Sequence, residues 1–211
     1  MYDKYMDAVN REMENAPLIK FFNGLEPQTP EVIEMCMAHT YNVKVKKNAL
    51  LVCPDAVCTE CLFFIVKGAV RGFIMDEDKD ITVWLTDENS LIGNIRNPGI
   101  PKMNYKEHMQ ALEDTELVVL PYDIIDQIYT KFPETNILGR KLLAIHYHVS
   151  QERSILSRIP SAEARYKQFK ETHPLLHFRV PVKFLASYLG MRIETLSRLR
   201  KKSKQEQNLM D

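Results

Sequence analysis

A stretch of polar and basic side chains within residues 180–202 has the composition needed to contact nucleic acid. Arg192, Glu194 and Arg198 are separated by two and four residues, which suits the exposed side of one helix. Arginine pairs with guanine and glutamate accepts from cytosine, so this combination could read base edges. The basic residues that follow suit phosphate contacts, which add affinity without sequence information. The candidate DNA-binding residues are Arg192, Glu194, Thr195, Ser197, Arg198, Arg200, Lys201 and Lys202.

Two short helices joined by a turn must hold these side chains. The apolar residues of their facing sides are Phe184, Leu185, Leu189, Leu196 and Leu199. Gly190 is a helix stop in left-handed conformation, and a second helix begins near Arg192. Ala186 stands where the two helices would cross closely, so a small residue is needed there. The pattern predicts a helix-turn-helix.

The charge of the chain is divided between its two parts. The 211 residues carry no net charge and suffice for two compact domains. Residues 1–139 hold 13 Lys and Arg against 22 Asp and Glu, a balance of −9, while residues 140–211 hold 15 against 6, a balance of +9. An acidic part joined to a basic part predicts a sensor or body coupled to a polyanion-binding tail.

The region before residue 121 reads as a β domain preceded by helices. The first 40 residues read as helical, with Pro30 after Thr29 as a helix start. Short apolar runs separated by turn signals such as Lys67-Gly68 then predict strands. They lie at 41–45, 49–52, 62–66, 69–75, 81–85 and 117–120. Many short strands with regular turns predict an antiparallel barrel or double-sheet jelly roll.

After Pro121 the pattern is helical, with a short helix at 122–131 and a long one over 135–159. The apolar residues of the long helix recur mostly at spacings of four and three, interrupted at Glu152. They are Leu138, Leu142, Ile145, Val149, Leu156 and Ile159. Such a seam fits either packing against the chain's own core or pairing of two subunits in a dimer. Pro160 ends this helix, and Ser161 is the N-cap of the next.

The segment LASYLGMRIETLSRLRKK resembles the recognition segment of the Crp/Fnr transcription regulators. LFFIVKGAVRGF at 62–73 is similar to that family's strand–glycine–strand signature, and QALEDTELVVLP at 110–121 to the end of its sensor barrel. SAEARY at 161–166 is similar to the start of the helix before the DNA-binding unit. The resemblance covers about residues 40–202. It implies an α+β fold with an N-terminal antiparallel β jelly roll of the cyclic-nucleotide-binding type, a long dimerisation helix and a C-terminal helix-turn-helix.

The resemblance implies three parts: a sensor domain at 1–121, a linker and dimerisation helix at 122–160, and a DNA-binding domain at 161–211. It implies a homodimer that pairs through the apolar seam of the long helix and binds a pseudo-palindromic site in double-stranded DNA. In that complex Glu194 and Arg198 would read bases, and RNA polymerase would be a partner. Ile193 stands where the family often has a polar or arginine side chain, which narrows direct readout. The ending KKSKQEQNLMD is too short and polar for the β-hairpin wing that often follows the recognition helix.

The resemblance also indicates where a ligand of the sensor would bind. Members that respond to cyclic nucleotides use a Gly-Glu-Leu turn for the ribose and an Arg-Ser pair for the phosphate. Here the turn includes Gly93 and Asn94, and the pair is replaced by Tyr105 and Lys106. The ribose carboxylate and the guanidinium fork are therefore both missing. The sequence predicts no cyclic AMP binding of the family kind, although an unidentified small-molecule effector could use the same cavity.

The cysteines allow a second sensing hypothesis. Cys53, Cys58 and Cys61 have the spacing of a plant-type iron–sulfur run, with Cys36 as a conceivable fourth thiolate. Cys58 and Cys61 could instead form a dithiol switch. The favoured interpretation is small buried apolar residues, and no metal site is predicted.

The remaining composition excludes other classes of protein. No glycine-rich phosphate loop, nucleophile elbow or zinc-protease motif is present, and residues 41–120 contain one histidine, His108. We therefore expect no enzyme, a metal-dependent jelly-roll oxygenase included. The polar opening, the lack of an 18-residue apolar run and the sparse cysteines predict an intracellular protein. The resemblance to the Crp/Fnr regulators implies a bacterial cytoplasmic one. The alternative function is a ligand-binding jelly-roll interaction module whose basic tail contacts another anionic partner.

Overall fold

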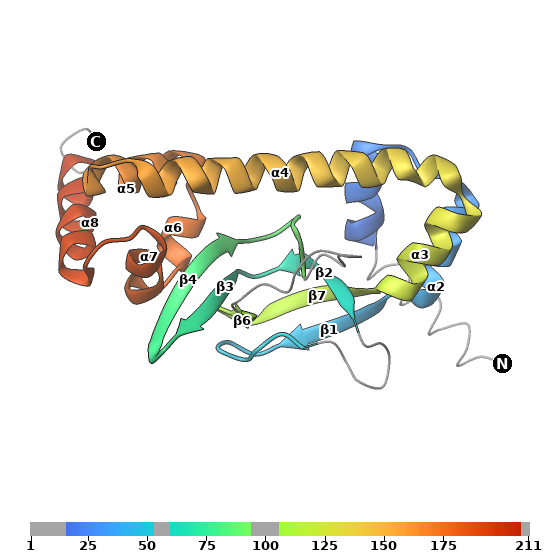
Figure 1. Cartoon of the computed structure of the whole chain (residues 1–211), viewed down its shortest axis with the longest axis horizontal. Helices are drawn as coiled ribbons and strands as arrows, with labels where there is room; N and C mark the ends of the chain where they lie inside the picture. The colour runs from blue at the N-terminus through green and yellow to red at the C-terminus, as the bar shows by residue number, and fades with distance from the viewer. Residues whose placement is uncertain (1–15, 53–59, 94–105, 208–211) are drawn as a thin grey trace.

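The computed structural model describes residues 16–52, 60–93 and 106–207. One long helix, α4 (Asn136–Arg158), runs along the molecule, with β strands beneath it and further helices gathered at both of its ends (Figure 1). This arrangement follows the predicted order of a β domain, a long helix and a C-terminal helical unit.

The strands form two antiparallel sheets, with the orders β1-β7-β2-β5 and β4-β3-β6. They are β1 (Tyr41–Val45), β2 (Cys61–Lys67), β3 (Val70–Asp76), β4 (Lys79–Thr86), β5 (Leu91–Gly93), β6 (Glu107–Ala111) and β7 (Thr115–Pro121). The predicted antiparallel double sheet is confirmed. The strand expected at 49–52 is wrong, because Leu50 forms only an isolated bridge to Gln110. Asn48, with φ 70°, bends the chain just before it.

A glycine and an apolar cluster fix how the sheets are joined. Gly68 between β2 and β3 has φ 113°, and a Cβ there would lie 2.4 Å from Thr115 Oγ1. Only glycine fits this turn without moving β7. A cluster that includes Phe63, Ile65 and Val119 fills the β domain, with the single tryptophan, Trp84, packed against it.

The helices follow the capping signals of the sequence. Residues 16–25 are helical, and the other helices are α2 (Pro30–His39), α3 (Tyr122–Lys131), η1 (Pro133–Thr135), α5 (Ala162–Thr172), α6 (Leu176–Arg179), α7 (Val182–Tyr188) and α8 (Ile193–Gln207). Ser161 caps α5, because its Oγ accepts from the Ala164 amide at 3.2 Å. Within the described part of the chain, α8 runs to Gln207 and no strand follows it. Among these residues no helix combines the length and apolarity needed to cross a membrane.

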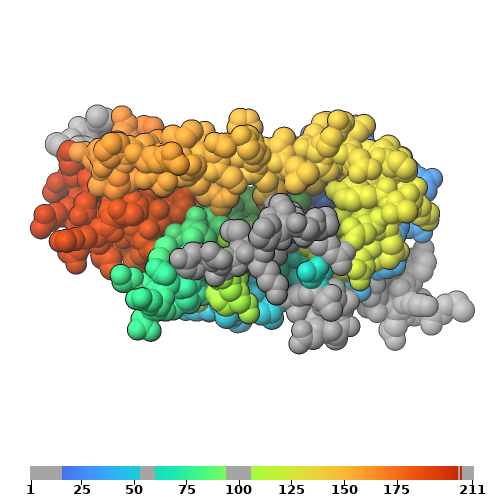
Figure 2. Space-filling view, viewed as in Figure 1, coloured from blue at the N-terminus to red at the C-terminus, as the bar shows by residue number. Residues whose placement is uncertain are grey.

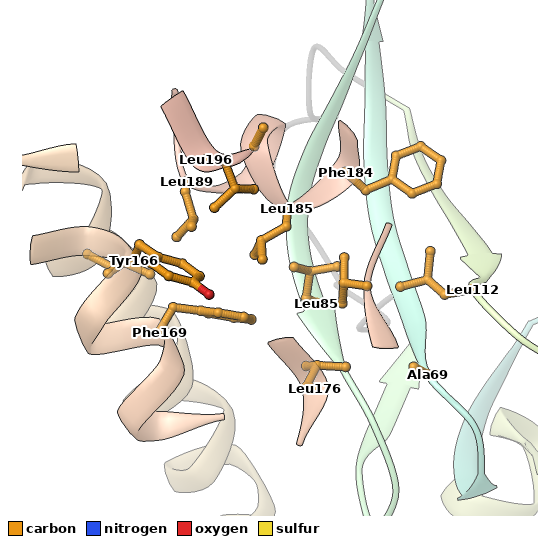
Figure 3. Close-up of a cluster of buried hydrophobic side chains, with 13 residues drawn as sticks. Ala69, Leu85, Leu112, Tyr166, Phe169, Leu176, Phe184, Leu185, Leu189 and Leu196 are labelled. Atoms are coloured by element: carbon orange, nitrogen blue, oxygen red, sulfur yellow. The ribbon is translucent and has the colours of Figure 1, made fainter. Parts of the chain in front are cut away.

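One hydrophobic cluster spans the predicted boundary between sensor and DNA-binding domains. Leu85 and Leu112 of the β domain pack with Phe169 of α5 and with Phe184 and Leu185 of α7 (Figure 3). Ala69, Leu156, Tyr166, Leu176, Val180, Ala186, Leu189 and Leu196 complete this cluster. The division at residues 121 and 160 remains a prediction, and the two parts share a core across it.

Candidate nucleic-acid interface

The turn between α7 and α8 has the geometry of a helix-turn-helix. Gly190 has φ 61°, the left-handed conformation that glycine adopts without strain. Its amide donates to the Ser187 carbonyl at 3.1 Å, and the Met191 amide donates to the Ala186 carbonyl at 3.0 Å. Ala186 is buried between the helices, as its small size predicted, beside Leu196, which has no exposed surface. The first helix therefore ends in a fixed turn that sets the direction of the second.

The outward face of α8 carries most of the predicted contact residues. Glu194, Ser197, Arg198 and Lys201 are exposed and recur at spacings of three and four, opposite the buried Leu196. Arg192 is exposed just before the helix, and Thr195 is half-buried at the flank. Ile193, which is 49% exposed, adds an apolar group at the start of the same helix. This face is a compact polar and basic surface with one carboxylate among cations.

Two other predicted contact residues lie elsewhere. The Arg200 guanidinium turns inward and donates to the carbonyls of His177 at 2.6 Å and Val180 at 3.2 Å. Arg200 therefore binds backbone carbonyls within α6 and between α6 and α7, and it does not face outward. Lys202 is exposed but pairs with Glu163 of α5, with Nζ and Oε1 2.7 Å apart. Arg200 is therefore not part of the outward face of α8. Lys202 is on the surface, but Glu163 partly neutralises its charge.

Sequence reasoning did not find Arg165, which holds the turn in place. Its guanidinium donates to the carbonyls of Leu189 and Gly190, and also to those of Ile159 and Pro160. One side chain thus joins the end of α4 to the turn of the helix-turn-helix. The sequence signal was only a single arginine near the start of α5, four residues after the N-cap Ser161.

The predicted seam of α4 divides between the chain's own core and its surface. Leu138 and Leu142 pack near α3, and Leu156 and Ile159 pack in the cluster below the helix-turn-helix. Ile145 and Val149 are 41% and 48% exposed. The exposed apolar side chains on the same stretch that the spacing missed are Leu143, Tyr147 and Ile155. Among the described residues, the middle of α4 is therefore the part of the helix whose apolar side chains remain exposed.

The ligand residues expected from the sensor are only partly within the described structure. Gly93 ends β5 with φ 140°, where a Cβ would lie 2.9 Å from the Cys61 carbonyl oxygen. Lys106 is exposed just before β6. Asn94 and Tyr105 lie outside the described residues. A ligand site there remains a prediction.

The cysteines that the structure describes are buried thiols. Burial raises the pKa of Cys36 and of Cys61 to about 11, which disfavours the thiolate needed for metal binding or exchange. Cys53 and Cys58 lie outside the described residues, so the iron–sulfur and dithiol hypotheses stay predictions. Within the described ranges no cluster of three or more His, Cys, Asp or Glu side chains could hold a metal ion.

Comparison with solved structures identifies the fold. No protein-family model and no curated protein sequence matches the chain. A cyclic nucleotide-binding domain containing protein from Listeria monocytogenes EGD-e has a TM-score of 0.64 at 14% identity, covering 90% of this chain and 91% of that one. FixK2 from Bradyrhizobium japonicum has a TM-score of 0.62 at 15% identity, covering 79% and 85%.

A transcriptional regulator from Eubacterium rectale ATCC 33656, described as of the crp/fnr family, has a TM-score of 0.62 at 14% identity, covering 85% of each chain. These likenesses show a cyclic-nucleotide-binding-type β domain joined by a long helix to a C-terminal helical domain. The chain has the fold of the Crp/Fnr regulators.

Proposed function

We propose that this protein is a DNA-binding transcription regulator of the Crp/Fnr type, not an enzyme. The observation that carries the proposal is the outward face of α8, where Glu194, Ser197, Arg198 and Lys201 lie opposite the buried Leu196. A helix-turn-helix places such a face in the major groove. There Arg198 would pair with guanine and Glu194 would accept from cytosine. Arg192 and Lys201 suit phosphates on either side.

The exposed middle of α4 supports a homodimer. Leu143, Tyr147 and Ile155 are between 54% and 66% exposed, a large apolar surface for the middle of one helix. Pairing of two α4 helices would cover it together with Ile145 and Val149. A twofold dimer places two recognition helices about one DNA turn apart, which requires a pseudo-palindromic site. The proposed interface is thus shorter than the whole predicted seam, because the ends of that seam pack in their own chain.

A regulator of this kind acts in the bacterial cytoplasm, where DNA and RNA polymerase are its partners. We keep a small-molecule effector in the sensor as part of the proposal. We expect no cyclic AMP binding of the family kind, because the family's carboxylate and guanidinium are replaced in the sequence. The β domain would then transmit the binding event through the core that it shares with α5 and α7.

Selection from a random duplex library with the purified protein tests the proposal. We expect enrichment of an inverted repeat, loss of preference at one base pair per half-site in Arg198→Ala, and no change in Arg140→Ala. Arg140 is exposed in the first turns of α4, about 27 Å along the helix from its far end. Its substitution removes the same charge away from the recognition surface.

Sedimentation of the same protein tests the dimer, with an expected mass of twice 24.6 kDa and a monomer in Tyr147→Glu. Enrichment of no sequence by a dimeric, folded protein would contradict DNA recognition. It would favour the alternative of a jelly-roll interaction module whose basic tail contacts another anionic partner.

A further inference from the structure

Helix α7 covers the edge of a sensor strand. Within the described part of the chain, strand β4 stands at the end of the order β4-β3-β6 and has a strand neighbour on one side only. An edge strand presents N–H groups that need other partners. The Thr82 amide donates to Ser187 Oγ of α7 at 3.0 Å, and Thr82 is only 3% exposed. The first helix of the helix-turn-helix thus supplies the missing acceptor on the sensor sheet.

A buried arginine on the neighbouring strand supports the same contact. Arg71 of β3 is 2% exposed, and Asp80 accepts from both of its terminal nitrogens, at 2.5 and 2.6 Å. Gln110 accepts from its Nε at 2.8 Å. The fixed guanidinium carbon lies 3.6 Å from the centre of the Phe184 ring of α7. A desolvated cation over an aromatic ring is attracted to it, so the contact between Arg71 and Phe184 stabilises the packing of α7 on the sheet.

A second arginine reaches the sensor from α6. Both carboxylate oxygens of Glu88 accept from Arg179, at 2.7 and 2.8 Å, and Glu113 accepts from it as well. These carboxylates belong to the turns that follow β4 and β6. Glu88 also accepts from the Gly68 amide at 2.8 Å, which fixes it to the sheet. The bidentate geometry makes Arg179 a directional tie between the two parts.

The contact leaves the recognition face of α8 open. Glu194, Arg198 and Lys201 are exposed, while the surfaces of α7 and of the sensor strands meet without a gap (Figure 2). Figure 3 shows the apolar side of this meeting, where Leu185 of α7 lies beside Leu85 of β4. The helix-turn-helix unit is therefore held by the sensor sheet in an orientation that still allows contact with DNA.

We propose that this contact positions the two recognition helices of the dimer for a half-site spacing, with Arg179 as its central positioning residue. We name it the sheet dock; its members are Arg71, Thr82, Glu88, Glu113, Arg179, Phe184 and Ser187. The inference rests on the proposed function, because it concerns how a dimer engages two half-sites. Without the dock, the helix-turn-helix unit keeps the Arg165 bonds to the end of α4 and the shared apolar core, but it loses the polar contacts that fix its angle to the sensor sheet. Each unit then still binds a half-site, but the pair no longer holds one separation.

The test compares an inverted repeat, a single half-site and repeats whose spacing is changed by one base pair. Arg179→Gln is expected to weaken binding to the repeat about tenfold, because the second half-site loses effective concentration. Binding to the single half-site stays unchanged, and the repeats of altered spacing are discriminated less. Glu113→Gln is expected to act in the same direction, although loss of a negative charge alone would strengthen DNA binding. Arg140→Gln is the charge-matched control for Arg179→Gln.

Hydrogen exchange at the Thr82 amide reports the dock without DNA. We expect slow exchange in the wild-type protein and faster exchange in Arg179→Gln and in Ser187→Ala. Ser187→Ala removes one hydrogen bond and leaves the buried core, so it serves as the milder variant if Arg179→Gln does not fold. Ser187→Ala is also expected to weaken binding to the inverted repeat, but by less than Arg179→Gln does.

Three outcomes would overturn the inference. Equal losses on the repeat and on the half-site would show that Arg179 acts on DNA directly. Stronger binding of Glu113→Gln would show simple electrostatics, and rapid exchange of Thr82 in the wild-type protein would show that the dock does not form. If the wild-type protein selects no repeat while Thr82 is protected, the proposed function fails although the dock exists, and the positioning role falls with it.

Discussion

The outward face of α8 and the inward side of the same helix-turn-helix unit both carry arginine, and they use it in opposite ways. Arg192 and Arg198 are exposed. Arg165, Arg179 and Arg200 donate to backbone carbonyls or carboxylates inside the chain. The balance of +9 in residues 140–211 therefore overstates the positive charge on the outward face of α8. Part of the basic composition stabilises the unit that presents the rest.

The inward arginines satisfy groups that a small helical unit leaves unpaired. Each helix ends with carbonyls that lack a partner within the helix, and this unit has several helix ends in a short stretch of chain. An arginine has five donors in a rigid fork, so a single side chain can reach several carbonyls. Arg165 does so at the end of α4 and at the turn before α8. We expect the two sets of arginines to be separable by experiment, one in folding stability and the other in DNA affinity.

The largest expected effect is the loss of Arg165. Arg165→Ala leaves carbonyls of Ile159, Leu189 and Gly190 without this donor, and a hydrogen bond from a charged group contributes about 1.5–3 kcal/mol. We expect the free energy of unfolding to fall by about 3 kcal/mol in urea titration. Arg198→Ala, the matched outward variant, is expected to change that free energy by less than about 0.5 kcal/mol. Equal stability of the two variants would contradict the division between inward and outward arginines.

Next in size is the loss of a base contact. Arg198→Ala is expected to weaken binding to the selected repeat by about 1–3 kcal/mol per half-site and to relax preference at one position. The physical reason is that a bidentate arginine distinguishes guanine from the other bases. Titration of labelled duplexes with each base at that position measures both effects. A uniform loss across all four bases would place Arg198 on phosphate instead.

The sequence was most informative where structure depends on neighbours in the chain. The period of Leu185, Leu189 and Leu196 and the glycine at 190 identified the helix-turn-helix, because caps and turns depend on adjacent residues. Arg179 and Arg200 could not be placed, since their partners lie 66 or 91 residues and 20 or 23 residues away. The composition of the chain gives the number of charged side chains, but it does not predict which carbonyl or carboxylate each of them binds.

The α4 seam shows the same limit for apolar residues. Spacing alone left both core packing and dimer pairing open, and the resemblance favoured pairing along the whole seam, yet Leu138 and Leu156 pack in the chain's own core. Leu143 and Tyr147 fell outside the heptad pattern, yet they are 57% and 66% exposed. The two ends of α4 pack on the chain's own core, whereas the middle of α4 exposes apolar residues on another side. A single heptad spacing therefore cannot describe both groups of apolar residues.

Acid should weaken the dock through Glu88. The Arg179 guanidinium holds the pKa of Glu88 at about 2, below the ordinary 4.5, so the ionised form is stabilised in the folded chain. This contribution is present above pH 4.5 and is lost as the pH falls toward 2. Burial and the Glu88 charge raise the pKa of the adjacent Asp87, whose protonation acts in the opposite direction. Glu113 is the other carboxylate that pairs with Arg179. The charges of Arg179 and His173 lower the pKa of Asp87.

We expect wild-type protein to be more stable than Glu88→Gln by about 1 kcal/mol at pH 6, a value reduced for the exposure of the pair. The difference should narrow as the pH falls from 4.5 to 3 in urea titrations of both proteins. Glu116→Gln, which alters the exposed pair with Lys44, is the control and should show little change at any pH. A constant difference for Glu88→Gln across this range would contradict ionisation of Glu88 as the source of the stability.

The smallest expected effect separates two neighbouring lysines of α8. Lys201 is exposed on the outward face, whereas Lys202 lies 2.7 Å from Glu163. Lys201→Ala should weaken all sequences alike and reduce the slope of log affinity against log salt by about 1 for each subunit, about 2 for the dimer, because each subunit loses one phosphate contact. Lys202→Ala should reduce it by less, since binding a phosphate there requires breaking an ion pair. Glu163→Gln removes this ion pair, so the salt slope should steepen in the Glu163→Gln protein, and the steepening should be absent in Glu163→Gln combined with Lys202→Ala. Equal slopes for Lys201→Ala and Lys202→Ala would mean that an exposed ion pair does not withhold a lysine from DNA.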